Sequence, residues 1–240
     1  MKRALLMASM ALCALAHGGE ATRLEHTATL IELFDAAQAR ELSRTLPADL
    51  AVRFQVRMPA NEADGPAGAL VFVKPDESGA FIEEWARLFD ERHLIWVSAD
   101  GFGNQKPTAQ RVLVAMMARQ LLARVATVDT RRVWLAGMSG GGRVASQTIT
   151  RFPHQFAGAL YVVGADFHLP EAPLRALALD RHYVFLTGSR DFNRREMRHV
   201  SERYTAAGAS HVLLIDEAGF GHQHATPALL ARALDFLDAR

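Results

Sequence analysis

Continuous apolar runs alternate with helical segments along most of this chain, and no other feature limits the possible folds as strongly. The runs at residues 69–73, 94–97, 159–163, 183–186 and 212–215 contain no charged residue. Strands of this kind are typical of a parallel sheet, in which both faces are buried. The segments between them carry apolar residues at the three-to-four spacing of helices that pack on one face. The alternation predicts an α/β fold: a mostly parallel, doubly wound sheet with helices on both faces.

The same patterns predict the individual elements. Apolar spacing predicts helices at residues 24–46, 78–93, 107–125, 144–152, 194–207 and 227–237. Alternation of apolar and polar side chains predicts a half-exposed strand at residues 52–56. The strands at 159–163 and 183–186 are joined by a short connection, so no large lid domain is expected. No linker, repeat or low-complexity stretch interrupts residues 17–240, and we expect them to form a single domain.

A glycine-rich turn joins one predicted strand to the helix that follows it. The turn has the pattern Gly-x-Ser-x-Gly, formed by Gly137, Ser139 and Gly141. When a strand reverses sharply into a helix, the residue at the apex has a strained backbone, and the residues two positions away must lack bulk. Such a turn exposes the hydroxyl at the carboxyl end of the strand. We therefore predict that Ser139 is a nucleophile.

A serine nucleophile needs a base that accepts its proton and a carboxylate that orients this base. In a parallel sheet, both partners are expected at the carboxyl ends of other strands. Asp191 directly follows a buried strand and is the preferred acid, ahead of Asp166 and Asp216. His222 lies in a glycine-containing loop after the last strand and is the preferred base, with His224 as the alternative.

Acyl transfer also requires hydrogen-bond donors at the oxygen that becomes negatively charged. The backbone N–H of Gly140, directly after the predicted nucleophile, is the first candidate. The second donor is expected in the loop at residues 74–79, after the first buried strand. Pro75 in this loop has no N–H. We therefore predict that Asp76 or a neighbour supplies the second donor.

Other kinds of site are disfavoured. His222 and His224 could approach a zinc ion together with Asp216, but no third histidine or cysteine stands at a suitable spacing. No Gly-Lys-Ser/Thr follows the glycines at 140–142, which argues against a phosphate-binding loop. The 27 Lys and Arg residues are mixed with 26 Asp and Glu residues, so no basic stripe indicates nucleic acid binding. We expect neither a cofactor nor a metal.

The N-terminus has the features of an export signal. A basic start at residues 2–3 precedes an apolar stretch at 4–16, whose end, Ala14-Leu15-Ala16, fits a small-x-small cleavage pattern. This stretch is shorter than the roughly 20 residues that span a bilayer. We therefore predict a signal peptide at residues 1–16, export to the periplasm or the medium, and no stable membrane insertion of the mature chain. The only cysteine, Cys13, lies within the predicted signal, which leaves the mature chain without a disulfide.

The segment Gly137-Met138-Ser139-Gly140-Gly141-Gly142-Arg143 resembles the nucleophile turn of the α/β-hydrolase superfamily, and the resemblance extends over nearly the whole mature chain. Within the superfamily, it is similar to exported esterases related to polyhydroxybutyrate depolymerases and to feruloyl or acetylxylan esterases. The resemblance implies Ser139 as nucleophile, Asp191 as acid and His222 as base. One departure concerns the oxyanion loop, where Lys74-Pro75 replaces the usual His-Gly. The second oxyanion donor and the substrate class therefore stay open.

Together these observations predict a serine esterase that hydrolyses carboxylic esters through an acyl-serine intermediate. The short connection without a lid predicts an open site, suited to a bulky small-molecule ester or to an ester carried on a polymer. Two alternatives stay open. One is a serine peptidase or thioesterase with the same triad. The other is a non-catalytic binding protein on a hydrolase scaffold, which the altered oxyanion loop favours.

Overall fold

The computed structural model describes residues 21–60, 65–172 and 174–239 and is built around one eight-stranded sheet. The strand order is β1-β2-β4-β3-β5-β6-β7-β8. The strands are β1 (Arg23–Ala28), β2 (Val52–Arg57), β3 (Ala67–Val73), β4 (Leu94–Ala99), β5 (Val128–Met138), β6 (Gly158–Val162), β7 (His182–Arg190) and β8 (His211–Gly221). Neighbours from β4 to β8 run parallel, whereas β2 is antiparallel to both β1 and β4. The predicted signal peptide at residues 1–16 lies outside the described residues.

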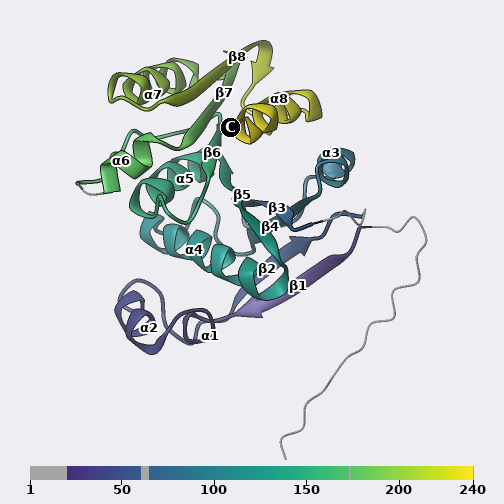
Figure 1. The fold of residues 1–240 in the computed structure, drawn as a ribbon, viewed down its shortest axis with the longest axis vertical. Coiled ribbons are helices and arrows are strands. Elements are labelled where there is room, and N and C mark those ends of the chain that lie inside the picture. The colour runs from purple at the N-terminus through teal and green to yellow at the C-terminus, as the bar shows by residue number, and fades with distance from the viewer. Residues whose placement is uncertain (1–20, 61–64, 173, 240) are drawn as a thin grey trace, which may run out of the picture.

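Helices cover both faces of the sheet. They are α1 (Leu30–Leu33), α2 (Ala36–Leu42), the 3₁₀ turn η1 (Glu83–Trp85), α3 (Ala86–Glu91), α4 (Thr108–Val125), α5 (Gly140–Arg151), α6 (Leu174–Leu179), α7 (Arg194–Ala206) and α8 (Pro227–Asp238). In Figure 1, α4, α5 and α7 lie on one side of the sheet, and α3 and α8 lie on the other. No helix in the described ranges is both long and apolar enough to cross a membrane.

Two hydrophobic cores, one on each face, hold the helices to the sheet. Successive side chains of a strand point to opposite faces. On β3, Ala69 and Val71 therefore pack in the core that includes Met117 of α4. Leu70 of the same strand packs in the second core, with Leu230 of α8. Because these strands are buried on both faces, their sequences are apolar throughout, and the predicted fold class is confirmed.

The predicted helix at residues 24–46 is wrong. Its first part forms the edge strand β1, which pairs antiparallel with β2. The rest is divided between α1 and α2, because Phe34 has an extended backbone with φ −120°. Asp35 then starts a new helix, and its carboxylate accepts hydrogen bonds from the N–H groups of Ala37 and Gln38. The apolar residues of α1 and α2 do have helical spacing, but the N-cap residue Asp35 between them ends one helix and begins the next.

Two connections determine what surrounds the carboxyl ends of the strands. The predicted helix at 78–93 is shorter than expected: η1 and α3 occupy only its second half, and a loop leads to them from β3. Between β6 and β7, the described residues form one short helix, α6, and no large lid. The carboxyl ends of the central strands are therefore bordered mainly by loops.

Candidate active site

Ser139 occupies a strained turn between β5 and α5. Its backbone has φ 54° and ψ −121°, a conformation that costs free energy for a residue with a side chain. The Ser139 N–H donates to the carbonyl of Val162 at 2.8 Å, which fixes the turn against β6. A Cβ added to Gly137 would lie 2.7 Å from the backbone N of Gly142, so this position accepts only glycine. The glycines of the motif are thus required by the close approach of strand and helix.

A chain of hydrogen bonds joins the three side chains that the sequence singled out. The Nε2 atom of His222 lies 2.9 Å from the Oγ of Ser139, and its Nδ1 lies 2.8 Å from Oδ1 of Asp191. An ionised carboxylate only accepts hydrogen bonds, so Nδ1 carries the proton that faces Asp191. Nε2 of the neutral ring is then the acceptor for the serine hydroxyl. The arrangement can therefore remove a proton from Ser139 and hold it on the imidazole.

The carboxylate of Asp191 is fully buried and fixed by its neighbours. Its Oδ2 accepts a hydrogen bond from the hydroxyl of Thr187 at 2.6 Å. Its Oδ1 also accepts the backbone N–H of Asn193 at 3.0 Å. The Asn193 side chain donates to the carbonyl of Val163, a second residue with positive φ at 48°. Two donors besides the imidazole therefore orient this acid, and the chain beside it is itself strained.

The imidazole of His222 is partly open to solvent, and an aromatic ring covers one of its faces. The ring of Phe192 stacks on it with centroids 3.9 Å apart and an interplanar angle of 21°. The side chain of Phe192 is itself largely exposed, at 77%. This ring therefore presents apolar surface directly beside the predicted base.

His224, the alternative base, points elsewhere. Its Nε2 bonds the carboxylate of Glu84 in η1. The loop that carries both histidines is also held by Trp85, whose indole N–H donates to the carbonyl of Ala225 at 2.7 Å. The structure therefore brings His222, and not His224, to Ser139.

The other candidate acids are bound to arginines. Asp166 accepts a hydrogen bond from Arg143 at 2.9 Å, and Arg143 also bonds Glu196. Asp216 accepts hydrogen bonds at 2.9 Å from Arg194 of α7 and from Arg198. The hydrogen bond from Arg194 lowers the pKa of the Asp216 carboxyl below its usual value. Both carboxylates are thus paired with arginines of helices, whereas Asp191 is the acid that contacts His222.

The oxyanion candidates lie on the other side of Ser139. Gly140 is the first residue of α5, where backbone N–H groups have no acceptor within the helix. The carboxylate of Asp76 accepts the N–H of Ser78 at 3.0 Å, and the Asp76 carbonyl carbon packs closely on Gly103. The structure therefore places Asp76 in the expected loop, and its role as a donor stays a prediction.

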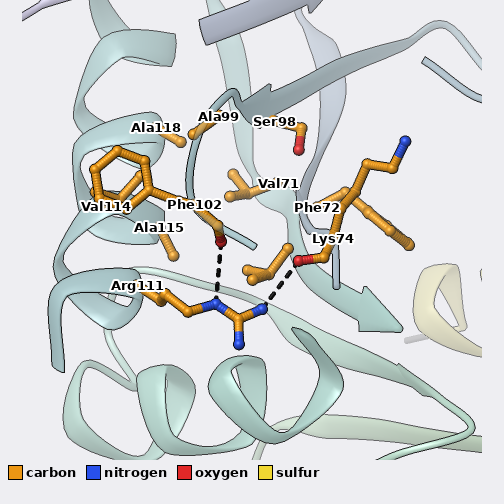
Figure 2. Close-up of a pocket in the computed structure, with 11 residues that line it drawn as sticks. Val71, Phe72, Lys74, Ser98, Ala99, Phe102, Arg111, Val114, Ala115 and Ala118 are labelled. Carbon is orange, nitrogen blue, oxygen red and sulfur yellow. Dashed lines mark hydrogen bonds between the residues drawn. The ribbon is translucent and has the colours of Figure 1, made fainter. Parts of the chain in front are cut away.

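Sequence analysis missed Arg111, a buried residue in the first turn of α4. Its Nε donates to the carbonyl of Phe102 at 3.1 Å, and its Nη2 donates to the carbonyl of Lys74 at 2.9 Å. Figure 2 draws both hydrogen bonds. Its Nη1 donates to Oδ1 of Asn104 at 3.0 Å. Burial lowers the pKa of the guanidinium, which nevertheless stays charged in proteins. The only signal in the sequence was a charged residue beside apolar ones at the start of a helix, which is common on protein surfaces.

Beside Arg111 lies a cavity of about 20 Å³, lined by β3, the end of β4 and α4. A cavity of this size holds about one water molecule and no organic substrate. Across the described residues, no group of three or more His, Cys, Asp or Glu side chains is placed to hold a metal ion.

No protein-family model matches the chain, and no curated protein matches it. Solved structures do resemble it in three dimensions. An S-formylglutathione hydrolase (FrmB) from Staphylococcus aureus superposes with a TM-score of 0.67 at 11% identity, covering 94% of this chain and 99% of that one. A bacterial heroin esterase gives 0.63 at 14% identity, covering 92% and 85%. The thermophilic carboxylesterase EstE1, from a metagenomic library, gives 0.60 at 16% identity, covering 87% and 95%.

The fold is that of the α/β-hydrolases. In this α/β-hydrolase sheet, β5 leads to Ser139, β7 leads to Asp191, and β8 leads to His222. The three parallel strands deliver these side chains to the same edge of the sheet, as the sequence analysis expected. The identities are too low to show more than the fold. The narrower resemblance to exported polyhydroxybutyrate depolymerases and feruloyl esterases stays a prediction.

Proposed function

We propose that this α/β-hydrolase is a serine hydrolase that cleaves carboxylic esters through an acyl-serine intermediate. One observation carries the proposal: an unbroken hydrogen-bond chain runs from Ser139 through His222 to the buried Asp191. The strained backbone of Ser139, with φ 54°, supports it, because strain at a site of this kind is retained where function requires it. The structures that resemble the chain are named as hydrolases and esterases, which is consistent with this chemistry.

The first half-reaction forms the acyl-enzyme. Oγ of Ser139 attacks the carbonyl carbon of the ester while Nε2 of His222 accepts the hydroxyl proton. The electron pair of the carbonyl π bond moves to the oxygen, and the N–H of Gly140 is placed to stabilise the resulting negative charge. The buried carboxylate of Asp191 keeps the Nδ1 proton in place and stabilises the imidazolium. The bond to the alcohol then breaks, and Nε2 returns its proton to the leaving oxygen.

The second half-reaction releases the acid. A water molecule takes the position of the departed alcohol and loses a proton to Nε2 of His222 as it attacks the acyl carbon. The bond between the acyl group and Ser139 breaks, and the proton on the imidazole returns to the serine oxygen. The carboxylic acid leaves, and the enzyme has its starting protonation again.

The substrate that we propose is a small-molecule ester, or an ester group carried on a polymer. Between β6 and β7 the described residues form only the short helix α6, and Phe192 offers exposed apolar surface beside His222. An open site of this kind accepts bulky alcohols or acids without movement of a lid. We therefore expect no abrupt rise in rate when a soluble ester exceeds its critical micelle concentration.

The experiment that tests the function is the Ser139→Ala substitution, assayed with short-chain nitrophenyl esters. Turnover should fall by at least about 10⁴-fold, because the nucleophile is lost, while the melting temperature stays nearly unchanged. Ser210→Ala, a change at an exposed serine before β8, is the matched control and should keep full activity. A fluorophosphonate probe should label the wild-type protein at Ser139 and leave the Ser139→Ala variant unlabelled. Retained turnover in Ser139→Ala, or no labelling of the wild type, would contradict the proposal.

The type of bond that the enzyme cleaves can be identified with three substrates that share one acyl group and differ in the bond to the leaving group. Turnover of an oxygen ester, a thioester and an amide separates an esterase from a thioesterase or a peptidase. The thioester deserves a place in this panel because one similar structure is a hydrolase of an S-formyl compound. Feruloyl and acetylated sugar esters would test the narrower resemblance to exported polymer-degrading esterases. We expect the oxygen esters to be hydrolysed fastest.

We also propose that the protein is exported after removal of its first 16 residues. The basic start, the apolar stretch and the small residues at its end support this proposal. Expression in a bacterial host followed by N-terminal sequencing should give a mature chain that starts near His17. A chain recovered only with residues 1–16 still attached would contradict it.

A further inference from the structure

The side chain of Asn104 fills the space beside Gly140. A Cβ built on Gly140 would lie 2.8 Å from Cγ of Asn104 and 3.0 Å from its Nδ2, and nearer still to its Oδ1. The amide of Asn104 therefore occupies the place that any other side chain at position 140 would need. Gly140 directly follows Ser139, so this amide lies next to the peptide group that is expected to face the reacting carbonyl oxygen.

Arg111 determines which end of the Asn104 amide faces it. Nη1 of Arg111 lies 3.0 Å from Oδ1 of Asn104, and a guanidinium only donates hydrogen bonds. The amide oxygen must therefore face Arg111, and the NH₂ group must point the other way. The backbone N–H of Asn104 is already used, since it donates to the carbonyl of Pro75 at 2.8 Å. The NH₂ group makes no hydrogen bond in the described part of the chain, and Asn104 is exposed.

The loops around this amide are held by the same guanidinium. Arg111 bonds the carbonyl of Lys74 after β3 and the carbonyl of Phe102 after β4 (Figure 2). Its Nη1 also lies 3.4 Å from the carbonyl of Gly140. Three segments that border one side of Ser139 thus share one buried cation. A displaced Arg111 would release Asn104 and loosen the loops together.

The sequence of the loop after β3 indicates why a donor from outside this loop, such as the Asn104 amide, would be required. Where the resembling esterases have His-Gly, this chain has Lys74-Pro75, and Pro75 has no N–H to offer. The carbonyl of Lys74 is turned toward Arg111. Pro75 therefore cannot join the N–H of Gly140 at the negative charge, for which acyl-transfer enzymes commonly provide two donors.

Resting on the proposed function, we propose that Nδ2 of Asn104 is the second oxyanion donor and that Arg111 positions it. During attack by Ser139, the oxygen of the ester carbonyl gains the electron pair of the π bond. The N–H of Gly140 and one N–H of the Asn104 amide then donate hydrogen bonds to this oxygen, and both are relaxed when the carbonyl re-forms. In this assignment Asn104 is a catalytic residue and replaces Asp76 as the second donor.

The Asn104→Asp variant tests the donor with little change of shape. Its carboxylate keeps the contact with Arg111 but has no N–H, so kcat should fall by about 100- to 1000-fold while KM changes by less than about threefold. Asn104→Ala should lower kcat in the same way without adding a charge. Gln105→Ala, a change at an exposed neighbour in the same loop, is the matched control and should keep the wild-type kcat. Circular dichroism and melting curves verify that each variant is folded.

The Gly140→Ala variant tests the same contact from the other side. It keeps the backbone N–H of residue 140, but its methyl group must displace the amide of Asn104. We expect kcat to fall by about 10- to 100-fold in the wild-type background and to change less than about twofold when Asn104 is already alanine. Such a dependence is the signature of two changes that remove one interaction. Equal losses in both backgrounds would overturn the assignment.

Binding of a transition-state analogue completes the test. A boronic acid that forms a tetrahedral adduct with Ser139 should bind Asn104→Asp and Asn104→Ala more weakly in proportion to the loss of kcat, while KM is unaffected. A variant that keeps kcat within about threefold of wild type, or that changes KM alone, would show that Asn104 is not an oxyanion donor. A wild-type protein that hydrolyses no ester and resists the fluorophosphonate probe would instead refute the proposed function.

Discussion

The two sides of Ser139 are built in different ways. The base side consists of His222 and Asp191, whose side chains are joined to Ser139 by direct hydrogen bonds. The oxyanion side consists of Gly140 and Asn104, together with the loops that Arg111 holds through the carbonyls of Lys74 and Phe102. On the base side, the chemistry belongs to titratable side chains at strand ends. On the oxyanion side, it belongs to N–H groups that one buried arginine positions.

This difference explains why the base side is conspicuous in a sequence and the oxyanion side is not. A serine between glycines, an acid and a histidine can each be recognised by type and by position after a buried strand. A backbone N–H is present at nearly every residue, so its role depends on geometry alone. A substitution on the base side removes the group that accepts the proton of Ser139. A substitution on the oxyanion side moves the N–H donors away from the carbonyl oxygen.

The largest effect is expected from Asp191→Asn on the base side. The amide can donate toward Nδ1 of His222, which favours the tautomer with its proton on Nε2 and removes the acceptor for the Ser139 hydroxyl. We expect kcat to fall by about 10⁴-fold, as when the acid of a serine triad is replaced by its amide. Steady-state kinetics with a nitrophenyl ester measures the loss. Asp166→Asn, which changes a rejected candidate acid, is the control and should cost less than about tenfold.

A similar loss in both variants would mean that the two carboxylates act together, and the base side would extend to Arg143. A large loss in Asp166→Asn alone would replace the assigned acid. Either outcome would contradict the description of the base side given above. The base would then depend on the charges around Arg143 and not only on the hydrogen bonds from Ser139 through His222 to Asp191.

An intermediate effect is expected from Arg111→Lys on the oxyanion side. Lysine keeps the charge but lacks the planar guanidinium group. It therefore cannot donate hydrogen bonds to Lys74, Phe102 and Asn104 at the same time. We expect kcat to fall by about 10- to 100-fold with little change in KM, and the free energy of unfolding to fall by about 1–3 kcal/mol because buried carbonyls lose a donor. Kinetics and denaturant unfolding measure the two effects separately.

Arg119→Lys provides a matched control for this variant. Arg119 is also a buried arginine of α4, and burial lowers its pKa as well. Within the described residues, its side chain donates to one group, the carbonyl of Gln155, at 2.9 Å. We expect the control to lose stability while keeping its kcat. An equal drop of kcat in both variants would show that Arg111 acts through general stability and not by positioning the oxyanion side.

Much of the fold could be predicted from the sequence, because strands that are buried on both faces appear as continuous apolar runs. The five apolar runs are strands in the structure, and Ser139, Asp191 and His222 meet because parallel strands deliver their ends to one edge. The edge strand β1 was missed because its residues are mostly exposed and lack such a pattern. Arg111 was missed for another reason: two of its partners are the backbone carbonyls of Lys74 and Phe102, and no residue type marks a carbonyl that accepts a hydrogen bond.

The smallest effect is expected from Asp216→Asn, which changes a carboxylate paired with two arginines and serves as a pH reference for Arg111. The hydrogen bond from Arg194 lowers the pKa of Asp216 in the folded state below its unfolded value of about 3.9. The stabilisation that the ionised carboxylate contributes is therefore full above that unfolded pKa and is lost as pH falls through the folded pKa. We expect Asp216→Asn to lower the free energy of unfolding by about 1 kcal/mol near neutral pH. The difference from wild type should vanish in stronger acid.

In an Arg194→Gln background the same change should cost less, since the main partner is gone. Arg111→Lys should behave differently over the same pH range, because the hydrogen-bond partners of Arg111 are carbonyl and amide oxygens that do not titrate, and lysine keeps the positive charge that interacts with Glu77. Its cost in stability should stay constant while the cost of Asp216→Asn disappears. A pH-dependent cost for Arg111→Lys would mean that a carboxylate such as Glu77 takes part in holding the oxyanion side, and the description of that side as bound by carbonyl and amide oxygens would then be wrong.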